Sequence, residues 1–211
     1  MPFVSTAALG ANADPPLDGF DDLPIWEEVP SDEKRYIQCV PGLPLTPTQI
    51  TEVIEKVAAF IAEQRNVYAS IARPLKESER AQLAVHFPAG ILDRVRLARV
   101  KHLQNPPFYA ELERMGFRNL PQFRQMAAVT FVDVVVTQEE FTPSLVFHEL
   151  VHVVQYQELG LEKFAELYVR GFLETGEYLS IPLERVAYHL EGLFRLRPDL
   201  AIEVEKQATS F

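Results

Sequence analysis

The fold is decided by residues 142–160, "TPSLVFHELVHVVQYQELG". Thr142 followed by Pro143 is typical of a helix start, because threonine caps free backbone N–H groups and proline fits the first helical turn. Gly160 is typical of a helix end. The residues between these signals are apolar around most of the helix circumference, which predicts a buried helix over 143–159.

Three polar residues interrupt this apolar run: His148, Glu149 and His152. The two histidines are one helical turn apart, so both imidazoles can reach one cation. Buried ionisable groups are costly unless they are paired or bind a metal. In the H-E-x-x-H arrangement, two histidines bind Zn²⁺ and the glutamate takes a proton from the metal-bound water. The alternative is a histidine pair that only hydrogen-bonds to carbonyl groups.

A catalytic zinc usually has three protein ligands, so a third must come from elsewhere in the chain. The extended motif H-E-x-x-H-x-x-G-x-x-H is not met, because Glu158 stands where its third histidine would be. The helix expected over 182–196 carries Glu184 and Glu191 on the same side, two turns apart, and His189 on the opposite border. Geometry alone leaves both glutamates open, and the first-turn position favours Glu184. Two further acids compete less well: Glu174 and Glu177.

A family resemblance joins these two segments. "HELVHVVQ" (148–155) followed by "PLERVAY" (182–188) resembles gluzincin-type zinc metallopeptidases. It is most similar to bacterial zincin-like domains with H-E-x-x-H-V-x-Q and a later P-x-E-x-x-A-D. The resemblance spans about residues 90–195 and implies a zincin-like fold.

The resemblance also implies a site. Its zinc ligands would be His148, His152 and Glu184, with Glu149 as general base and acid. The chain departs from the pattern at Tyr188, where the family has an aspartate that steadies a ligand histidine. Tyr188 could do so through its hydroxyl, or could polarise the substrate carbonyl.

Substrate binding has its own candidates. Zinc peptidases commonly bind the substrate along an edge strand, and the β-branched run 127–137 is the candidate strand. An ordinary core strand is an equal alternative. Tyr188, Tyr178 and His189 could stabilise the oxyanion, although each residue type is more often a packing or surface residue.

Caps and hydrophobic periodicity predict the other elements. Residues 1–34 form an acidic, proline-containing arm, and 35–211 form one domain. The fold class is α+β, zincin-like, mostly helical with a small sheet packed on the H-E-x-x-H helix. The expected strands are 35–40 and 127–137, with the ambiguous 91–100 as a third, and the expected helices are 47–65, 77–86, 107–115, 143–159, 161–175 and 182–196.

The composition narrows the function classes. The chain has 211 residues, 47% of them hydrophobic, and a formal charge of −10. Nucleic acid is not expected as a partner, because phosphate binding needs a basic surface. The sequence shows neither a signal peptide nor a run long enough to span a membrane, so we expect a soluble cytoplasmic protein. Export without a cleaved signal stays open.

Two function classes follow. The first is a zinc peptidase acting on a peptide or protein, and the second is a non-catalytic zinc-binding domain for structure or partner binding. Glu149 favours the first, because a structural site needs no base and is usually closed by four ligands. Cys39, the one cysteine, could cap the metal, with a small buried residue as the alternative. The basic cluster of Arg94, Arg96, Arg99 and Lys101 could hold the acidic arm, and His86 and His102 have no metal-ligand spacing.

Overall fold

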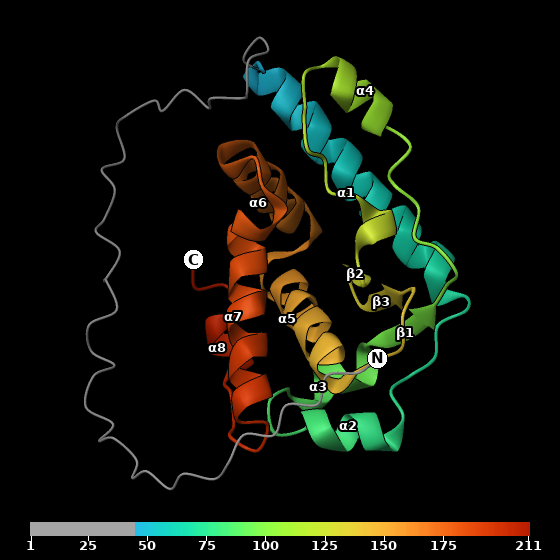
Figure 1. Ribbon diagram of the computed structural model, residues 1–211, viewed down its shortest axis with the longest axis vertical. Coiled ribbons are helices and arrows are strands. Elements are labelled where there is room, and N and C mark those ends of the chain that lie inside the picture. Colours follow the sequence, from blue (N-terminus) through green and yellow to red (C-terminus); the bar gives the residue numbers. More distant parts are fainter. Residues whose placement is uncertain (1–44) are drawn as a thin grey trace, which may run out of the picture. The chain divides into compact units, whose positions relative to one another are not determined.

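The computed structural model describes residues 45–211 (Figure 1). The expectations for the arm 1–34, the strand 35–40 and Cys39 lie outside the described residues. The described part is mostly helical with one three-stranded sheet, which confirms the α+β class.

The sheet has the strand order β1-β3-β2. β1 (Arg96–Arg99) pairs in parallel with β3 (Val134–Thr137), and β2 (Ala128–Phe131) pairs antiparallel with β3. The prediction of one strand over 127–137 is therefore wrong, because this segment is a tight hairpin. Its turn begins at Val132, whose φ of 59° is rare for a β-branched residue.

Contacts from distant residues hold this turn. The Arg65 guanidinium makes two hydrogen bonds to Asp133, with Nε–Oδ1 and Nη2–Oδ2 distances of 2.7 and 2.9 Å. The Asp133 carbonyl accepts the Arg96 N–H at 2.8 Å. The hairpin turn is thus fixed by long-range partners instead of by the glycine or asparagine that usually occupies such a turn.

Strand alternation divides the core in two. Successive side chains of a strand point to opposite faces. Leu97 and Val135 belong to the cluster that packs on α5 (Pro143–Leu159), whereas Ala98 and Val134 belong to the cluster on α1 (Pro47–Ala69). The sheet therefore lies between α5 and α1.

The helices largely follow their capping signals. Thr46 and Gln49 form a capping box at the start of α1, and α1 runs one turn beyond the predicted end at 65. The segment 91–100 is divided, because it contains the end of α3 and all of β1. The remaining helices are α2 (Glu77–Leu83), α3 (Ala89–Arg94), α4 (Tyr109–Arg114), α6 (Leu161–Thr175), α7 (Pro182–Leu196) and α8 (Val204–Gln207), with 3₁₀ turns at Phe123–Gln125 and Tyr178–Ser180.

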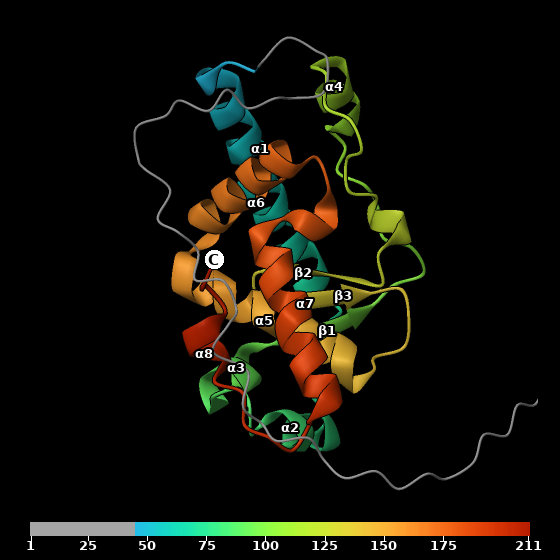
Figure 2. The ribbon, with the colours of Figure 1, turned by 60° about the vertical axis from the view of Figure 1, so that its left-hand side comes forward.

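Helices α5, α6 and α7 form the layer that carries the predicted site (Figure 2). α6 and the start of α7 approach closely at Gly171. A Cβ atom there would lie 2.8 Å from Pro182 Cδ and 3.3 Å from Ile181 Cγ2. Glycine at this position therefore lets the first turn of α7 lie against α6. Within residues 45–211, no helix is both long and apolar enough to cross a membrane.

Candidate metal centre

Helix α5 holds its three polar residues in the interior. The Thr142 hydroxyl accepts the Leu145 N–H at 3.2 Å and caps the helix. Every residue from Val146 to Tyr156 is buried, as the apolar circumference predicts. His148, Glu149 and His152 are only 4–5% exposed, so they do not form a solvated face.

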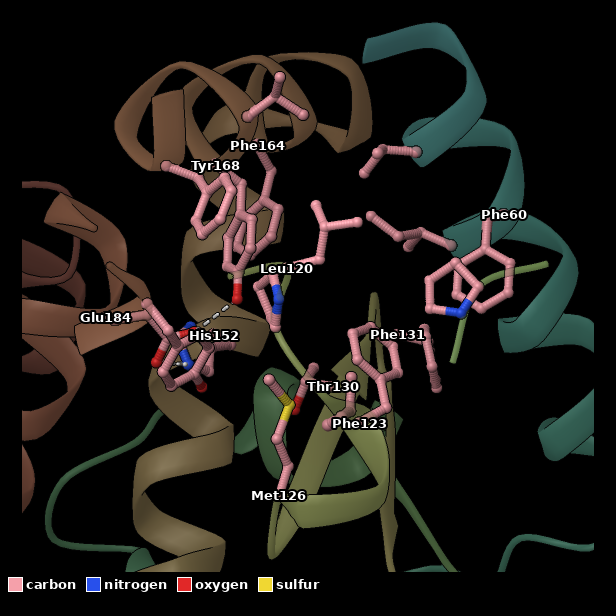
Figure 3. Close-up of a pocket in the computed structure, with 18 of the residues that line it drawn as sticks. Phe60, Leu120, Phe123, Met126, Thr130, Phe131, His152, Phe164, Tyr168 and Glu184 are labelled. Carbon is pink, nitrogen blue, oxygen red and sulfur yellow. Dashed lines mark hydrogen bonds and ion pairs between the residues drawn. The ribbon is translucent and has the colours of Figure 1, made fainter. Parts of the chain in front are cut away.

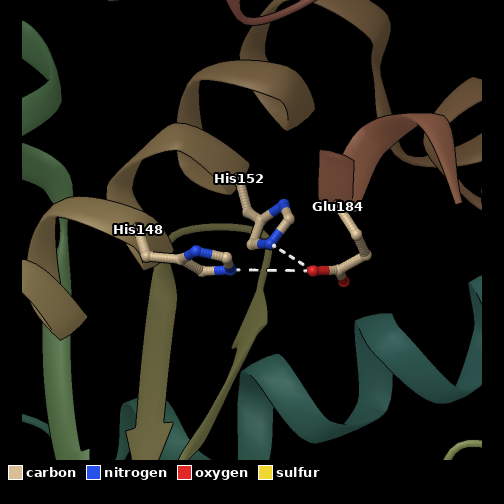
Figure 4. Close-up of side chains that lie close together, drawn as sticks. All are labelled: His148, His152 and Glu184. Atoms are coloured by element: carbon tan, nitrogen blue, oxygen red, sulfur yellow. Dashed lines mark ion pairs between the residues drawn. The ribbon is translucent and has the colours of Figure 1, made fainter. Parts of the chain in front are cut away.

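Helix α7 brings Glu184 to the two histidines. Glu184 Oε2 lies 3.6 Å from His148 Nε2 and 3.5 Å from His152 Nε2 (Figure 4). The Tyr168 hydroxyl, from α6, donates to Glu184 Oε1 at 3.2 Å and so orients the carboxylate. Glu184 Oε2 is buried and has no hydrogen-bond partner within the described part of the chain.

These three side chains could hold a metal ion. One donor atom from each of His148, His152 and Glu184 lies within 4.8 Å of the others. Nitrogen and oxygen ligands at 2.0–2.2 Å from a tetrahedral zinc lie about 3.3–3.6 Å apart. The two nitrogen–oxygen distances match that spacing. Glu184 Oε2, which lacks a hydrogen bond, is the atom that a cation would satisfy.

Gln155 fixes the protonation of His152. The Gln155 side-chain nitrogen donates to Leu183 O at 3.0 Å and to Ala208 O at 2.9 Å. The amide orientation is therefore determined, and its oxygen lies 2.7 Å from His152 Nδ1. An amide oxygen can only accept, so His152 Nδ1 carries the proton and leaves the Nε2 lone pair for a metal.

Glu191 is the acid nearest the other nitrogen of His148. Its Oε2 lies 3.3 Å from His148 Nδ1. Burial lowers the pKa of His148, but the Glu184 and Glu191 carboxylates outweigh this effect and raise it to about 10. Burial raises the pKa of Glu184, and the two histidines outweigh it and lower that pKa well below its usual range. Without a metal, the centre is thus held together by ion pairs.

Glu149 is hydrogen-bonded to β2. The Thr130 hydroxyl donates to Glu149 Oε2 at 2.6 Å. Thr130 reaches it because alternation along β2 turns its side chain to the α5 face. This bond fixes the carboxylate beside the donor set.

A narrow cavity and a wider groove meet at Glu149. The cavity has a volume of about 120 Å³ and extends from His152 and Glu184 toward Phe60 on α1 (Figure 3), and Glu149 is among its lining residues. The groove has a volume of about 720 Å³ and passes His148, Glu149 and Tyr188. The centre is therefore accessible from a polar surface on one side and borders an apolar interior on the other.

Tyr188 lies at the edge of the centre. Its ring packs on the His148 ring, with centroids 4.5 Å apart, and it is 44% exposed. Burial, with the nearby Glu184 and Glu149 carboxylates, raises the Tyr188 pKa to about 12. Tyr178 borders both the cavity and the groove.

The structure leaves the other candidates outside the centre. His189, Glu174 and Glu177 are exposed. His86 is buried among core residues, with Nε2 2.9 Å from Pro198 O and Nδ1 accepting the Ile202 N–H at 3.3 Å. In the basic cluster, Arg94 binds Gln157, Arg96 binds backbone carbonyls and Arg99 pairs with Glu140.

Three residues around the centre had no role assigned from the sequence: Thr130, Gln155 and Tyr168. Gln155 lies inside the quoted motif and so carried a signal. Glu191 was a candidate third ligand, and the structure places it at His148 Nδ1 instead. Tyr168 falls in the expected helix 161–175 and Thr130 in the expected strand 127–137, and the sequence indicates no partner for either. Comparisons of the chain with protein-family models, with curated proteins and with solved structures found no match.

Proposed function

We propose that this chain is a zinc-dependent peptidase of the gluzincin type. His148, His152 and Glu184 would hold Zn²⁺, since two imidazoles and one carboxylate are a donor set of catalytic zinc sites. The observation that carries the proposal is Glu184 Oε2, which has no hydrogen-bond partner in the described chain and lies 3.6 and 3.5 Å from the two Nε2 atoms. The motif resemblance over about residues 90–195 supports the same assignment.

The chain's own residues suit hydrolysis of a peptide bond. Zinc, when bound, supplies a Lewis acid and lowers the pKa of water to about 7. Glu149 would accept the proton of the attacking water and pass it to the leaving amine. Thr130 keeps this carboxylate in place through the 2.6 Å hydrogen bond. Tyr188, beside His148 at the open groove, would donate its hydroxyl to the substrate carbonyl oxygen.

A free strand edge is available for the substrate backbone. β2 is an edge strand, and Ala127 O accepts the Gln138 N–H from the chain beyond β3. Because backbone groups alternate along an antiparallel strand, the N–H and C=O of Ala128 point to the opposite, free side. Ala128 borders the groove and the cavity. A peptide or protein segment pairing there would pass Glu149.

The second candidate is a zinc-binding domain that does not cleave peptides. The hydrogen bond from Thr130 favours it, because a buried glutamate with such a partner can have a purely structural role. The open groove at His148 and Glu149 favours the peptidase, since a structural zinc site is closed by four ligands.

Two variants separate these functions. We expect one Zn²⁺ per chain in the wild type and loss of tight zinc binding in His148→Ala.

Glu149→Gln should keep zinc and fold and lose nearly all peptide cleavage, because the water then lacks a proton acceptor. Glu158→Gln, an exposed change on the same helix, is the matched control. If the wild type holds zinc and cleaves nothing in a diverse peptide library, the non-catalytic function is correct.

A further inference from the structure

The cavity beside the metal centre has a mostly apolar lining. His152 and Glu184 lie at the end nearest the centre (Figure 3), and Glu149 and Thr130 also line the cavity. The opposite end is formed by α1 and α6, where the lining includes Val53, Val57, Val169 and Phe172. A molecule bound here would therefore place an apolar group deep in the cavity and a polar group against Glu149.

Aromatic rings line both long walls of the cavity. On one wall, Phe60 lies edge-on to Phe131, with centroids 6.1 Å apart and an interplanar angle of 77°. On the other wall, Phe164 stacks on Tyr156 at 3.7 Å and on Tyr168 at 5.9 Å. Such walls favour an aromatic occupant, because ring edges and faces attract each other.

The volume limits the occupant to one ring or one branched chain. An apolar cavity of about 150 Å³ in an engineered protein stays dry and binds benzene. At about 120 Å³, this cavity suits a phenyl or isobutyl group. We propose that it takes the phenyl-sized apolar side chain of the substrate residue next to the hydrolysed bond. This inference rests on the proposed peptidase function and names its substrate class.

The neighbouring groove supplies room for the rest of a peptide. It shares Leu120, Met126, Glu149 and Tyr178 with the cavity. Its other lining residues include amide and carboxylate side chains, among them Gln122, Gln125, Glu113 and Glu191. A polar peptide backbone suits this lining, whereas a long acyl chain would leave the groove's polar groups without partners.

The first test measures occupancy without catalysis. Benzene, titrated into the zinc-loaded protein, should shift the methyl NMR signals of residues lining the cavity. Val57→Phe places a ring into the cavity from α1 and should abolish these shifts. Val67→Phe is the matched control, because Val67 is 53% exposed on the same helix and does not line the cavity. Benzene shifts that persist unchanged in Val57→Phe, or that are absent from the wild type, overturn the proposal.

The second test measures selectivity with peptides that vary at the two positions flanking the cleaved bond. Phe and Leu at one of these positions should give kcat/KM at least about tenfold above Ala and Lys. Val57→Phe should lose this preference, and Val67→Phe should keep it. If Val57→Phe does not fold, the kcat/KM values of the wild type with the varied peptides still test the proposal.

The outcomes also separate this inference from the peptidase proposal. Efficient cleavage with no preference for Phe or Leu overturns the inference and leaves the peptidase in place. Stronger cleavage of an octanoyl amide than of the Phe peptide also overturns it. Benzene binding without cleavage of any peptide overturns the peptidase, and the cavity then stands only as an apolar binding site.

Discussion

At the scale of single residues, Gln155 connects three separate parts of the chain. Its amide touches a ligand histidine on the same helix, the Leu183 carbonyl beside the ligand Glu184, and the Ala208 carbonyl near the end of the chain. Both amide hydrogens and the oxygen are used. A group that orients a metal ligand typically affects metal affinity by 10–100-fold.

We expect Gln155→Leu to bind zinc about 10–100-fold more weakly than the wild type. It should also lower the free energy of unfolding by about 1–3 kcal/mol, because two buried carbonyl groups lose their donors. Chelator competition measures the affinity, and ¹⁵N chemical shifts of the His152 imidazole report which nitrogen carries the proton.

Gln157→Leu provides the matched control for this change, since Gln157 is an exposed glutamine on the same helix. It should bind zinc as the wild type does. Unchanged zinc affinity and an unchanged His152 proton in Gln155→Leu would contradict the role assigned to this amide.

The sequence predicts part of the centre at this scale. Helical spacing predicts that His148, Glu149 and His152 belong to one site, and a single sequence shows this spacing directly. Glu184 and Glu191 could not be separated, because a helical wheel gives direction but not reach along the axis. Contacts such as Thr130 to Glu149 join different elements, and no local pattern predicts them.

At the scale of elements, the position of Glu184 depends on how closely α7 approaches α6. Gly171 permits that approach, because any Cβ atom would lie 2.8 Å from the Pro182 ring. Pro182 starts the helix turn that carries Glu184. A shift of this turn would move the carboxylate away from His148 and His152.

Gly171→Ala should therefore lower the free energy of unfolding. Overpacking against Pro182 costs about 1–3 kcal/mol, and the higher helix propensity of alanine offsets about 1 kcal/mol of that cost. Its zinc affinity should fall by roughly tenfold. Urea unfolding and chelator competition measure the two effects. Gly192→Ala in α7, where a Cβ meets nothing within 4 Å, should gain about 0.5–1 kcal/mol and bind zinc normally. Equal behaviour of the two variants would show that the close approach does not position Glu184.

Helix ends were predicted better than strands, for a physical reason. The threonine caps before α1 and α5 and the glycine that closes α6 act locally, so the sequence displays them. The hairpin at Val132 was missed because valine does not favour positive φ, and Arg65 and Arg96 hold the turn from a distance. The parallel pairing of β1 with β3 is likewise non-local.

Backbone hydrogen bonds tie the segment after α1 to the sheet, and a salt bridge ties it to α2. Arg73 pairs with Leu97 through backbone hydrogen bonds of 3.0 and 2.8 Å. Glu79 accepts two hydrogen bonds from the Arg73 guanidinium, each 2.7 Å, and one from the Lys76 N–H. The Arg73 hydrogen bonds are the main cause that holds the pKa of Glu79 below its usual range.

Stability should depend on pH through Glu79. A carboxyl whose folded pKa is lowered stabilises the fold above its unfolded pKa, about 4.3, and loses this effect as the pH falls through the folded pKa. Glu79→Gln should lower the free energy of unfolding by about 1 kcal/mol at pH 7, because solvent screens the pair. The difference from wild type should shrink below about pH 4. Glu77→Gln, exposed in the same turn, should show no such pH dependence, and a pH-independent Glu79 difference would refute the assignment.

At the scale of the whole molecule, the centre joins the two core clusters. His148 and His152 lie on α5, whose apolar residues pack mainly with the first cluster, while Tyr156 and Leu183 belong to the second. α8 closes the first cluster through Val204 and Ala208.

Zinc should therefore raise the stability of the entire fold. A ligand that binds only the folded state stabilises it by about 4 kcal/mol at a free concentration 1,000 times its Kd. For a domain of this size, that corresponds to a rise in Tm of roughly 8–16 °C. Calorimetry of zinc-loaded and chelator-treated protein measures the shift. Glu149→Gln should keep it, because this residue is not among the three donors, whereas His152→Ala should show nearly the same Tm with and without zinc. A zinc-dependent shift of equal size in His152→Ala would mean that zinc stabilises the protein from another site. This result would contradict the assignment of the zinc site between α5 and α7.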